Sequence, residues 1–485
     1  MATQLATKPP AAAGAKAPWG ALIFLALAQL MVVLDGTIVN LALPQLQHEM
    51  GISDSTRAWV VTGYALALGA FLLLGGRIAD FWGRKRTFLV AAAGFALASL
   101  LGGIAQEAWE LIGARALQGL FAALLAPAAL ALLTVAFPGG KDRGTAFAIF
   151  GSISGVGAAI GVLLGGYLTD YVSWRWCFFI NVPIAVLALI GVWTKVEESK
   201  AGGPAKYDWP GVVLAALGLG SLVFGFTNAE HGWASPEAWG FILAGAILLV
   251  LFVLVQKRSP HPLLPLRVAT ERNRGAAFLA SFLSGAVLIG GILFINYYLQ
   301  IVLGLRPFLA GIASLPMTAV LMVTAGLAAK NLPRLGARVP TAVGPVLIAA
   351  AMLWLTGVTA DGTYLVNMLP ALLLLGAGLG LVFVPLQNLA LFGVGKDDSG
   401  VASALVNASQ QVGGSLGIAL FSTIAASATA AAGGAGLAAL SAGYSQVFLW
   451  AAGVAILIVP AALLLIDISR ATFSGAAADT PAVHL

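Results

Sequence analysis

Two charged residues stand out because they lie inside apolar stretches of the chain. Asp35 lies in VVLDGTIVNLALP, residues 32–44, and Arg115 lies in LIGARALQGLFAA, residues 111–123. Apolar surroundings disfavour the charged form of a carboxyl group, whereas a nearby guanidinium stabilises it. The two residues could therefore form a site that takes up and releases a proton. The alternative is a structural ion pair that only holds helices together.

The composition indicates that both residues belong to a membrane protein. Of the 485 residues, 60% are hydrophobic and 9% are charged, and the mean hydropathy is +0.96. Soluble domains carry about 25% charged residues. The apolar residues form blocks of about 20, the length of a helix that crosses a bilayer. We expect an all-α integral membrane protein with 14 transmembrane helices, at residues 19–43, 58–76, 87–105, 109–136, 145–168, 176–194, 209–227, 238–256, 276–299, 308–329, 340–360, 364–390, 401–424 and 444–466.

The basic residues predict how these helices are oriented. If the N-terminus is cytoplasmic, 21 of the 25 Lys and Arg residues fall on the cytoplasmic side, as the positive-inside rule requires. Arg57, Arg175 and Arg306 fall outside, and Arg115 lies within a helix. We therefore expect a multi-pass protein of the cell inner (plasma) membrane, with both termini cytoplasmic. The net charge of +6 then belongs to cytoplasmic loops and indicates no nucleic-acid partner.

Helix geometry places the two buried charges at a similar depth. Asp35 lies nine residues before Pro44, roughly 13 Å from the outer membrane face, and Arg115 lies roughly 9 Å from the same face. Of 19 acidic residues, Asp35 alone lies well inside a span. A charge at the membrane centre costs about 2.5–3.5 kcal/mol, so such a residue usually faces water or a partner.

Six segments together resemble the fourteen-helix drug:proton antiporters of the major facilitator superfamily. They are LDGTIVNLALP (34–44), GGRIADFWGRKR (75–86), LIGARALQGLFAA (111–123), GVGAAIGVLLGGYL (155–168), WRWCFFINVPIA (174–185) and YYLQIVLGLRPFLAGIASLP (297–316). The resemblance implies a major facilitator fold, with two pseudo-symmetric six-helix halves and an inserted helix pair. It also implies proton-coupled export of hydrophobic, neutral or cationic drug-like molecules or antibiotics, with Asp35 and Arg115 coupling transport to protons.

The predicted organisation follows from these spans. NLPRLGARVP (331–340) looks like a degraded copy of the segment at 75–86, which supports two repeated halves. The expected segments are a disordered cytoplasmic tail (1–18), an N-terminal half (19–194), a cytoplasmic linker (195–208), the inserted pair (209–256), a cytoplasmic loop (257–275), a C-terminal half (276–467) and a cytoplasmic tail (468–485). We expect a monomer surrounded by the lipid bilayer.

Two of the resembling segments carry further implied roles. The first predicts a conformational-switch loop made of Gly76, Asp80, Gly83, Arg84 and Lys85, which could also be a simple positive-inside anchor. The second is a ridge of small residues for close helix packing, made of Gly157, Gly161 and Gly165. Phe81 replaces the basic residue usual after the loop aspartate, and Val162 replaces a proline usual on the ridge. Val162 leaves the direction of transport open.

Polar side chains within the spans predict where a substrate would bind. Ser403, Asn407, Gln411 and Ser415 recur every four residues, so they share one helix face. The predicted substrate cavity is lined by Gln118, Asn296, Gln300, Asn407 and Gln411, although each of these could instead form hydrogen bonds between helices.

Enzymatic functions fit the sequence poorly. The four histidines lie in loops or a tail, and the chain has one cysteine and no phosphate-binding G-x-x-x-x-G-K-[ST] motif. We therefore expect a non-enzymatic protein without metal or cofactor, powered by an ion gradient. A proton-coupled importer or uniporter of a small metabolite is the alternative, and a scaffold or sensor without transport is a second one.

Overall fold

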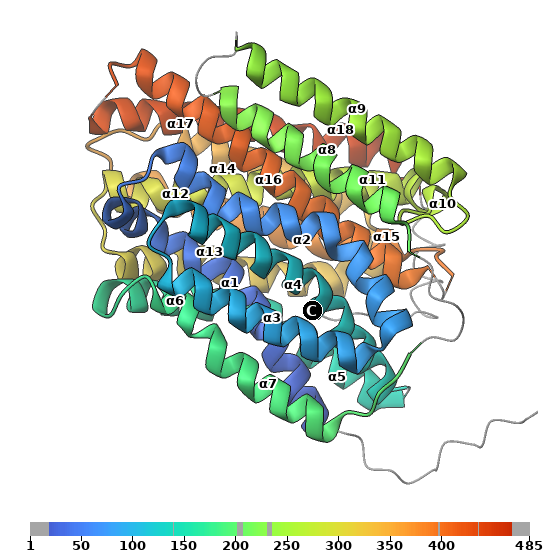
Figure 1. Ribbon diagram of the computed structural model, residues 1–485. Coiled ribbons are helices and arrows are strands. Elements are labelled where there is room, and N and C mark those ends of the chain that lie inside the picture. The colour runs from blue at the N-terminus through green and yellow to red at the C-terminus, as the bar shows by residue number, and fades with distance from the viewer. Residues whose placement is uncertain are drawn as a thin grey trace, which may run out of the picture.

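The computed structural model describes residues 19–138, 140–200, 207–229, 235–395, 398–434 and 436–467. The predicted tails at 1–18 and 468–485 and the middle of the predicted linker therefore lie outside the described residues. Helices make up nearly all of the rest (Figure 1). The first seven are α1 (Trp19–Met50), α2 (Asp54–Trp82), α3 (Arg84–Ile104), α4 (Ala108–Ala136), α5 (Gly140–Tyr171), α6 (Trp176–Phe179) and α7 (Asn181–Lys195).

The remaining elements include three π-helical segments, labelled η. They are α8 (Trp209–Asn228), α9 (Pro236–Arg258), α10 (Leu266–Ala269), α11 (Arg272–Gly285), η2 (Ala286–Gly291), α12 (Ile292–Tyr297), η3 (Tyr298–Val302), α13 (Pro307–Leu335), α14 (Arg338–Leu355), η4 (Tyr364–Met368), α15 (Leu369–Leu391), α16 (Ser399–Ala431), α17 (Leu437–Ile456) and α18 (Ile458–Leu465).

Fourteen helical segments in the described part of the chain are long and apolar enough to cross a membrane, which confirms the predicted number. Four of them join several elements, namely α6 with α7, α11 through η3, η4 with α15, and α17 with α18. Some helices run beyond the apolar blocks. The first continues through Pro44 to Met50, because Leu46 still packs into the core and Gln45 bonds Glu49 one turn later.

The two halves of the bundle meet along two helix pairs, α2 with α16 and α5 with α13. These contacts are close. A Cβ on Gly69 of α2 would lie 3.0 Å from Val412 of α16, and one on Gly166 of α5 would lie 2.7 Å from the backbone of Phe308. The pseudo-symmetry is visible in two corresponding turns, where Gly83 (φ 128°) ends α2 and Gly336 (φ 69°) ends α13.

The inserted pair, α8 and α9, lies beside this two-half bundle (Figure 1). The first of the two contacts α2 and α16, whereas α9 lies at the edge. Accordingly, α9 exposes apolar side chains such as Leu243, which is 62% exposed and suits contact with lipid. Asp208 caps the start of α8 and also accepts a hydrogen bond from Gln256 near the end of α9, at 2.6 Å, which ties the pair together.

Candidate functional site

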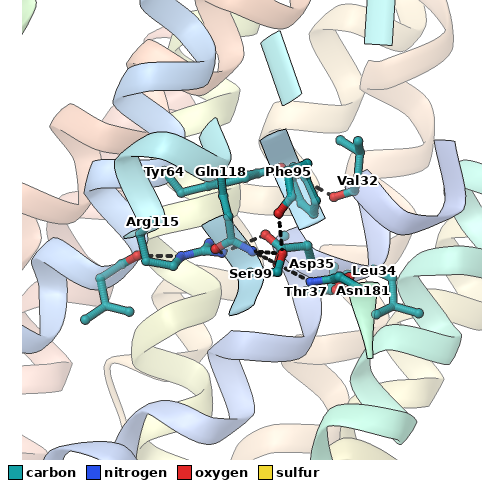
Figure 2. A network of polar contacts seen from close by, with 12 residues as sticks. Val32, Leu34, Asp35, Thr37, Tyr64, Phe95, Ser99, Arg115, Gln118 and Asn181 are labelled. Atoms are coloured by element: carbon teal, nitrogen blue, oxygen red, sulfur yellow. Dashed lines mark hydrogen bonds and ion pairs between the residues drawn. The ribbon is translucent and has the colours of Figure 1, made fainter. Parts of the chain in front are cut away.

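Asp35 lies midway along α1 and faces the interior of the N-terminal half. Its side chain is 0% exposed, and its Oδ2 atom lies 2.6 Å from Nη1 of Arg115 on α4, which is buried as well. The structure therefore brings together the two charged residues that the sequence places at a similar depth. Figure 2 shows how the neighbouring polar side chains converge on this carboxylate.

Gln118 is the second partner of Asp35, and it comes from the next turn of α4. Its Nε2 atom donates to Oδ1 of Asp35 and to Oγ of Ser99, both at 2.8 Å, and its Oε1 atom accepts from Nη1 of Arg115 at 2.9 Å. The sequence predicted that Gln118 lines the substrate cavity. In this structure Gln118 is fully buried and both polar atoms of its amide are bonded within the Asp35 network, so its role in a substrate cavity stays a prediction.

Asn181 is the third partner, and the sequence analysis did not single it out. It is the first residue of α7, and its Nδ2 atom donates to Oδ1 of Asp35 at 2.8 Å. Its own Oδ1 atom is buried and has no hydrogen-bond partner. The available signal was an amide side chain at the start of an apolar span, but asparagine is also a common helix-capping residue.

Besides Asp35, uncharged groups hold Arg115 in place. Its Nε atom donates to the carbonyl oxygen of Val60 at 3.0 Å, and its guanidinium lies over the ring of Tyr64 with 4.3 Å between the guanidinium carbon and the ring centroid. All members of the network come from α1, α2, α3, α4 and α7. The site therefore lies within one half of the bundle and not between the halves.

This arrangement allows one simple chemical step, the binding of a proton to Asp35. The carboxylate has its charge balanced by a single guanidinium in a site without water contact. Breaking a buried ion pair by removing one charge costs about 3–5 kcal/mol, because the other charge is left without compensation. Protonation of Asp35 would therefore strongly favour a rearrangement around Arg115.

The predicted cavity residues do not gather in one place. Because Gly413 of α16 packs on Phe282 of α11, and Phe421 packs on Gly290, these helices run in parallel. That alignment puts Asn296 and Gln300 roughly 30 Å farther along the bundle than Asn407 and Gln411. Asn296 is buried, Asn407 is exposed, and Gln300 and Gln411 are half-buried. Their role as cavity residues stays a prediction.

Three charged residues join the two halves at the end of the bundle that holds the turn between α1 and α2, here named the α1–α2 end. The guanidinium of Arg57, at the start of α2, lies over the ring of Tyr297 on α12. Asp170 of α5 accepts from Nε of Arg306 at 3.3 Å and from the backbone N–H of Phe308 at 3.1 Å. The sequence assigned Arg57 and Arg306 to the outer side but gave no reason to pair them with these residues.

Comparison with known proteins assigns the chain to a family. The sequence profile of the Major Facilitator Superfamily matches residues 25–208 and 209–418. The chain belongs to the major facilitator superfamily. It is therefore a multi-pass membrane transporter and not an enzyme, as the sequence predicted.

Several characterised relatives within this superfamily are similar over most of their length. The chain is 45% identical to a puromycin resistance protein of Streptomyces alboniger, over 96% of this chain and 94% of that protein. It is 37% identical to a cephamycin export protein of Amycolatopsis lactamdurans, over 84% and 85% of the two chains. It is 35% identical to a tetracenomycin C resistance and export protein of Streptomyces glaucescens, over 84% and 76%.

Solved structures show the same major facilitator fold. An auto-inhibited peptide transporter of the POT family superposes with a TM-score of 0.66 at 15% identity, over 93% of this chain and 98% of that one. The xylose transporter XylE from E. coli superposes with a TM-score of 0.62 at 13% identity, over 94% and 98%. At such identities the likeness concerns the fold alone.

The predicted switch loop of this major facilitator protein makes its contacts near the start of α3. Asp80 pairs with Arg84 at 2.9 Å, and Nζ of Lys85 donates to the carbonyl oxygen of Trp193 at 2.8 Å. Glu198 accepts from the backbone N–H of Lys85 at 3.0 Å and lies beside Gly83.

A further glycine of the loop, Gly76, faces Pro127 of α4. These contacts remain within the N-terminal half and its following segment, and the switching role stays a prediction.

The predicted glycine ridge of α5 packs against α1. A Cβ on any of the three glycines would meet an atom of α1; the α1 residues facing Gly157, Gly161 and Gly165 are Leu30, Thr37 and Ile38. All three glycines thus face α1, and the role of the ridge as a helix-packing device stays a prediction. Val162, which replaces the usual proline, directs its carbonyl oxygen towards Gly311 of α13 and so lies at the contact between the halves.

Proposed function

We propose that this protein exports hydrophobic, antibiotic-like small molecules across the cell inner membrane in exchange for protons. The substrate class is supported by the relatives, whose names record puromycin resistance, cephamycin export, and tetracenomycin C resistance and export. The molecules would be neutral or cationic. Both termini would be cytoplasmic, in keeping with the distribution of Lys and Arg.

The observation that carries the proton-coupling part of the proposal is the enclosure of Asp35. Its carboxylate has three donors at 2.6–2.8 Å and no contact with solvent. A purely structural role does not explain a charged pair here, because apolar side chains of similar volume often pack equally well or better. An ionisable residue within the membrane is therefore a functional candidate by default.

In the proposed cycle the charged and protonated forms of Asp35 belong to different conformations. The deprotonated form pairs with Arg115 and favours substrate binding. Protonation leaves Arg115 without its counter-charge, so the enclosed arrangement loses stability and the halves rearrange to release the substrate. In the proposed orientation, the contacts of Arg57 with Tyr297 and of Asp170 with Phe308 at the α1–α2 end would close the protein towards the outside.

Transport by inverted membrane vesicles tests this proposal. In energised vesicles, wild-type protein should accumulate ethidium when the lumen is acidic, and Asp35→Asn should reduce this uptake at least ten-fold while the protein remains folded and present at normal levels. Asparagine keeps the size of the side chain and removes the proton site. Unchanged transport by the variant would leave the structural ion pair as the better interpretation. Substrate movement with the protons, instead of against them, would favour the importer.

A further inference from the structure

Asn181 uses only half of its amide group. Its Nδ2 atom donates to Oδ1 of Asp35 at 2.8 Å, whereas its Oδ1 atom is buried without a hydrogen-bond partner. Buried polar atoms are nearly always paired, and each exception needs an explanation. A charged carboxylate cannot donate a hydrogen bond to this oxygen, but a protonated carboxyl group can. The oxygen of Asn181 is therefore free to accept a hydrogen bond from Asp35 once Asp35 is protonated.

The neighbouring amide of Gln118, by contrast, has hydrogen-bond partners on both its oxygen and its nitrogen. Its Oε1 atom accepts from Nη1 of Arg115, and its Nε2 atom donates to both Asp35 and Ser99. Turning this amide over would put its oxygen against the carboxylate and its NH₂ group against the guanidinium. Gln118 is therefore fixed in one orientation, whereas Asn181 has no second bond that opposes rotation.

The surroundings also determine which oxygen of Asp35 can take the proton. Its Oδ2 atom accepts a hydrogen bond from an N–H group of the Arg115 guanidinium, and this leaves no room for a proton bound to Oδ2 itself. The other titratable groups that face Asp35 are Tyr64 of α2 and Cys177 of α6. The hydroxyl of Tyr64 is directed at the carbonyl oxygen of Val32, and the thiol of Cys177 contacts Thr169. A proton on Oδ1 thus finds its acceptor in Asn181.

We propose that Asn181 is a positioning residue whose amide reverses when Asp35 is protonated. With Asp35 charged, Nδ2 of Asn181 donates to Oδ1 of the carboxylate. When Oδ1 takes up a proton from water in a conformation that opens the site to solvent, the amide turns over and its own oxygen accepts from the new O–H group. No bond in Asn181 breaks, and both protonation states keep a hydrogen bond at this position. The inference rests on the proposed proton coupling and adds the residue that accommodates it.

Infrared difference spectroscopy of the reconstituted full-length protein, at acidic against neutral pH, tests this reversal without any transport. Two signals are expected. The first is the carbonyl band of a protonated carboxyl group, absent in Asp35→Asn. The second is an asparagine amide carbonyl band that moves to lower wavenumber on acidification, because this oxygen gains a donor. The second band should respond to ¹³C-labelled asparagine and vanish in Asn181→Leu.

Asn40→Leu is the matched control, because Asn40 lies on the same helix as Asp35 but bonds the carbonyl oxygen of Gly36 in that helix and not the carboxylate. It should keep both bands. If Asn181→Leu does not fold, loss of the amide band in Asp35→Asn would assign the band to an asparagine that responds to Asp35, and Asn181 is the asparagine that bonds this carboxylate. A carboxyl band without the amide band would overturn the role of Asn181 and leave proton binding intact, whereas the absence of both would overturn the two proposals together. Both bands in a protein without proton-driven efflux would support Asn181 and refute the coupling.

Discussion

Arg57 of the N-terminal half lies over the ring of Tyr297 of the C-terminal half, with 3.7 Å between the guanidinium carbon and the ring centroid. The arginine is buried, and its Nη2 atom pairs with Asp54 at 3.0 Å. Tyr297 ends α12, a short helix between the π-helical segments η2 and η3. Because π-helical turns often mark functional sites, this contact is a good candidate for the gate at the α1–α2 end.

Replacing the arginine should shift the protein towards a form that is open at this end. A desolvated cation–π contact contributes about 0.5–2 kcal/mol, so Arg57→Ala should raise the population of the open form about 2- to 30-fold. Spin labels on Gln106→Cys and Asp361→Cys, at exposed positions, would report the distance between the halves. The native Cys177 is buried and should remain unlabelled.

Arg175→Ala is the control for this measurement. Arg175 also lies at the α1–α2 end, but it bonds the carbonyl oxygens of Gly103 and Ala105 and stacks on Trp174, all within its own half. Its loss should lower thermal stability without changing the distance distribution. The gate assignment is wrong if Arg57→Ala and Arg175→Ala give the same distribution.

The second contact between the halves should depend on the aspartate more than on the arginine. Arg306 is 58% exposed and Asp170 only 8%, so solvent screens their ion pair, which contributes at most about 1 kcal/mol. Asp170→Ala also leaves the backbone N–H of Phe308 without its acceptor, at a cost of about 1–3 kcal/mol. The same spin labels should show a larger opening for Asp170→Ala than for Arg306→Ala, and the reverse order would contradict this account.

The spans and the central ion pair could be predicted from the sequence, because hydropathy determines the helices and helix rise determines depth. Asn181 could not, since it is separated from Asp35 by 146 residues and only the packing of α7 on α1 brings them together. The position of Gln118 was partly predictable, because residues three apart share a helix face and Arg115 already faces Asp35. An interhelical hydrogen bond, the alternative role for such a residue, is what Gln118 makes in this structure.

The other predicted cavity residues lie far apart along the bundle, and the sequence could not predict this for a different reason. Sequence periodicity determines which residues share a face of one helix, but it does not determine how far neighbouring helices are shifted along their axes. Asn296 and Gln411 could therefore be predicted as polar positions on two helices. Their separation along the bundle follows from the contact of Gly413 with Phe282, which no periodic pattern encodes.

The glycine ridge of α5 should tolerate alanine unequally. A Cβ at position 165 would lie 2.5 Å from the carbonyl oxygen of Ile38, a backbone atom that cannot move aside, whereas one at 157 would lie 3.0 Å from the flexible end of Leu30. We expect Gly165→Ala to lower the midpoint of thermal unfolding and to impair transport, and Gly157→Ala to have a small effect. Equal effects at the two positions would argue against packing on α1 as the function of the ridge.

Gly161 allows a direct test by compensation. A methyl group there would collide with the hydroxyl of Thr37, and the carbonyl oxygen of Leu34 lies farther away at 3.3 Å. Thr37→Ala should therefore restore most of the stability that Gly161→Ala loses, while it should not rescue Gly165→Ala. Thermal unfolding of the two single variants and the double variant measures the coupling. Strictly additive losses would show that the two side chains do not compete for the same space.

The charge balance at Asp35 predicts discrimination between monocations and dications. Among the described residues Asp35 is the only fully buried acidic residue inside a span, and it is shared with Arg115. A monocation can replace Arg115 as the partner of this single carboxylate, whereas the second charge of a dication has no partner there, and an uncompensated charge within the membrane costs about 2.5–3.5 kcal/mol. Proton-driven transport of propidium should therefore be at least ten-fold slower than that of ethidium, which shares its ring system and carries one charge fewer.

Asn407→Asp, which adds a carboxylate at an exposed position of α16, should reduce this difference in transport rate between the two dyes. Equal rates for the two dyes in the wild-type protein would mean that another acidic group reaches the substrate during the cycle.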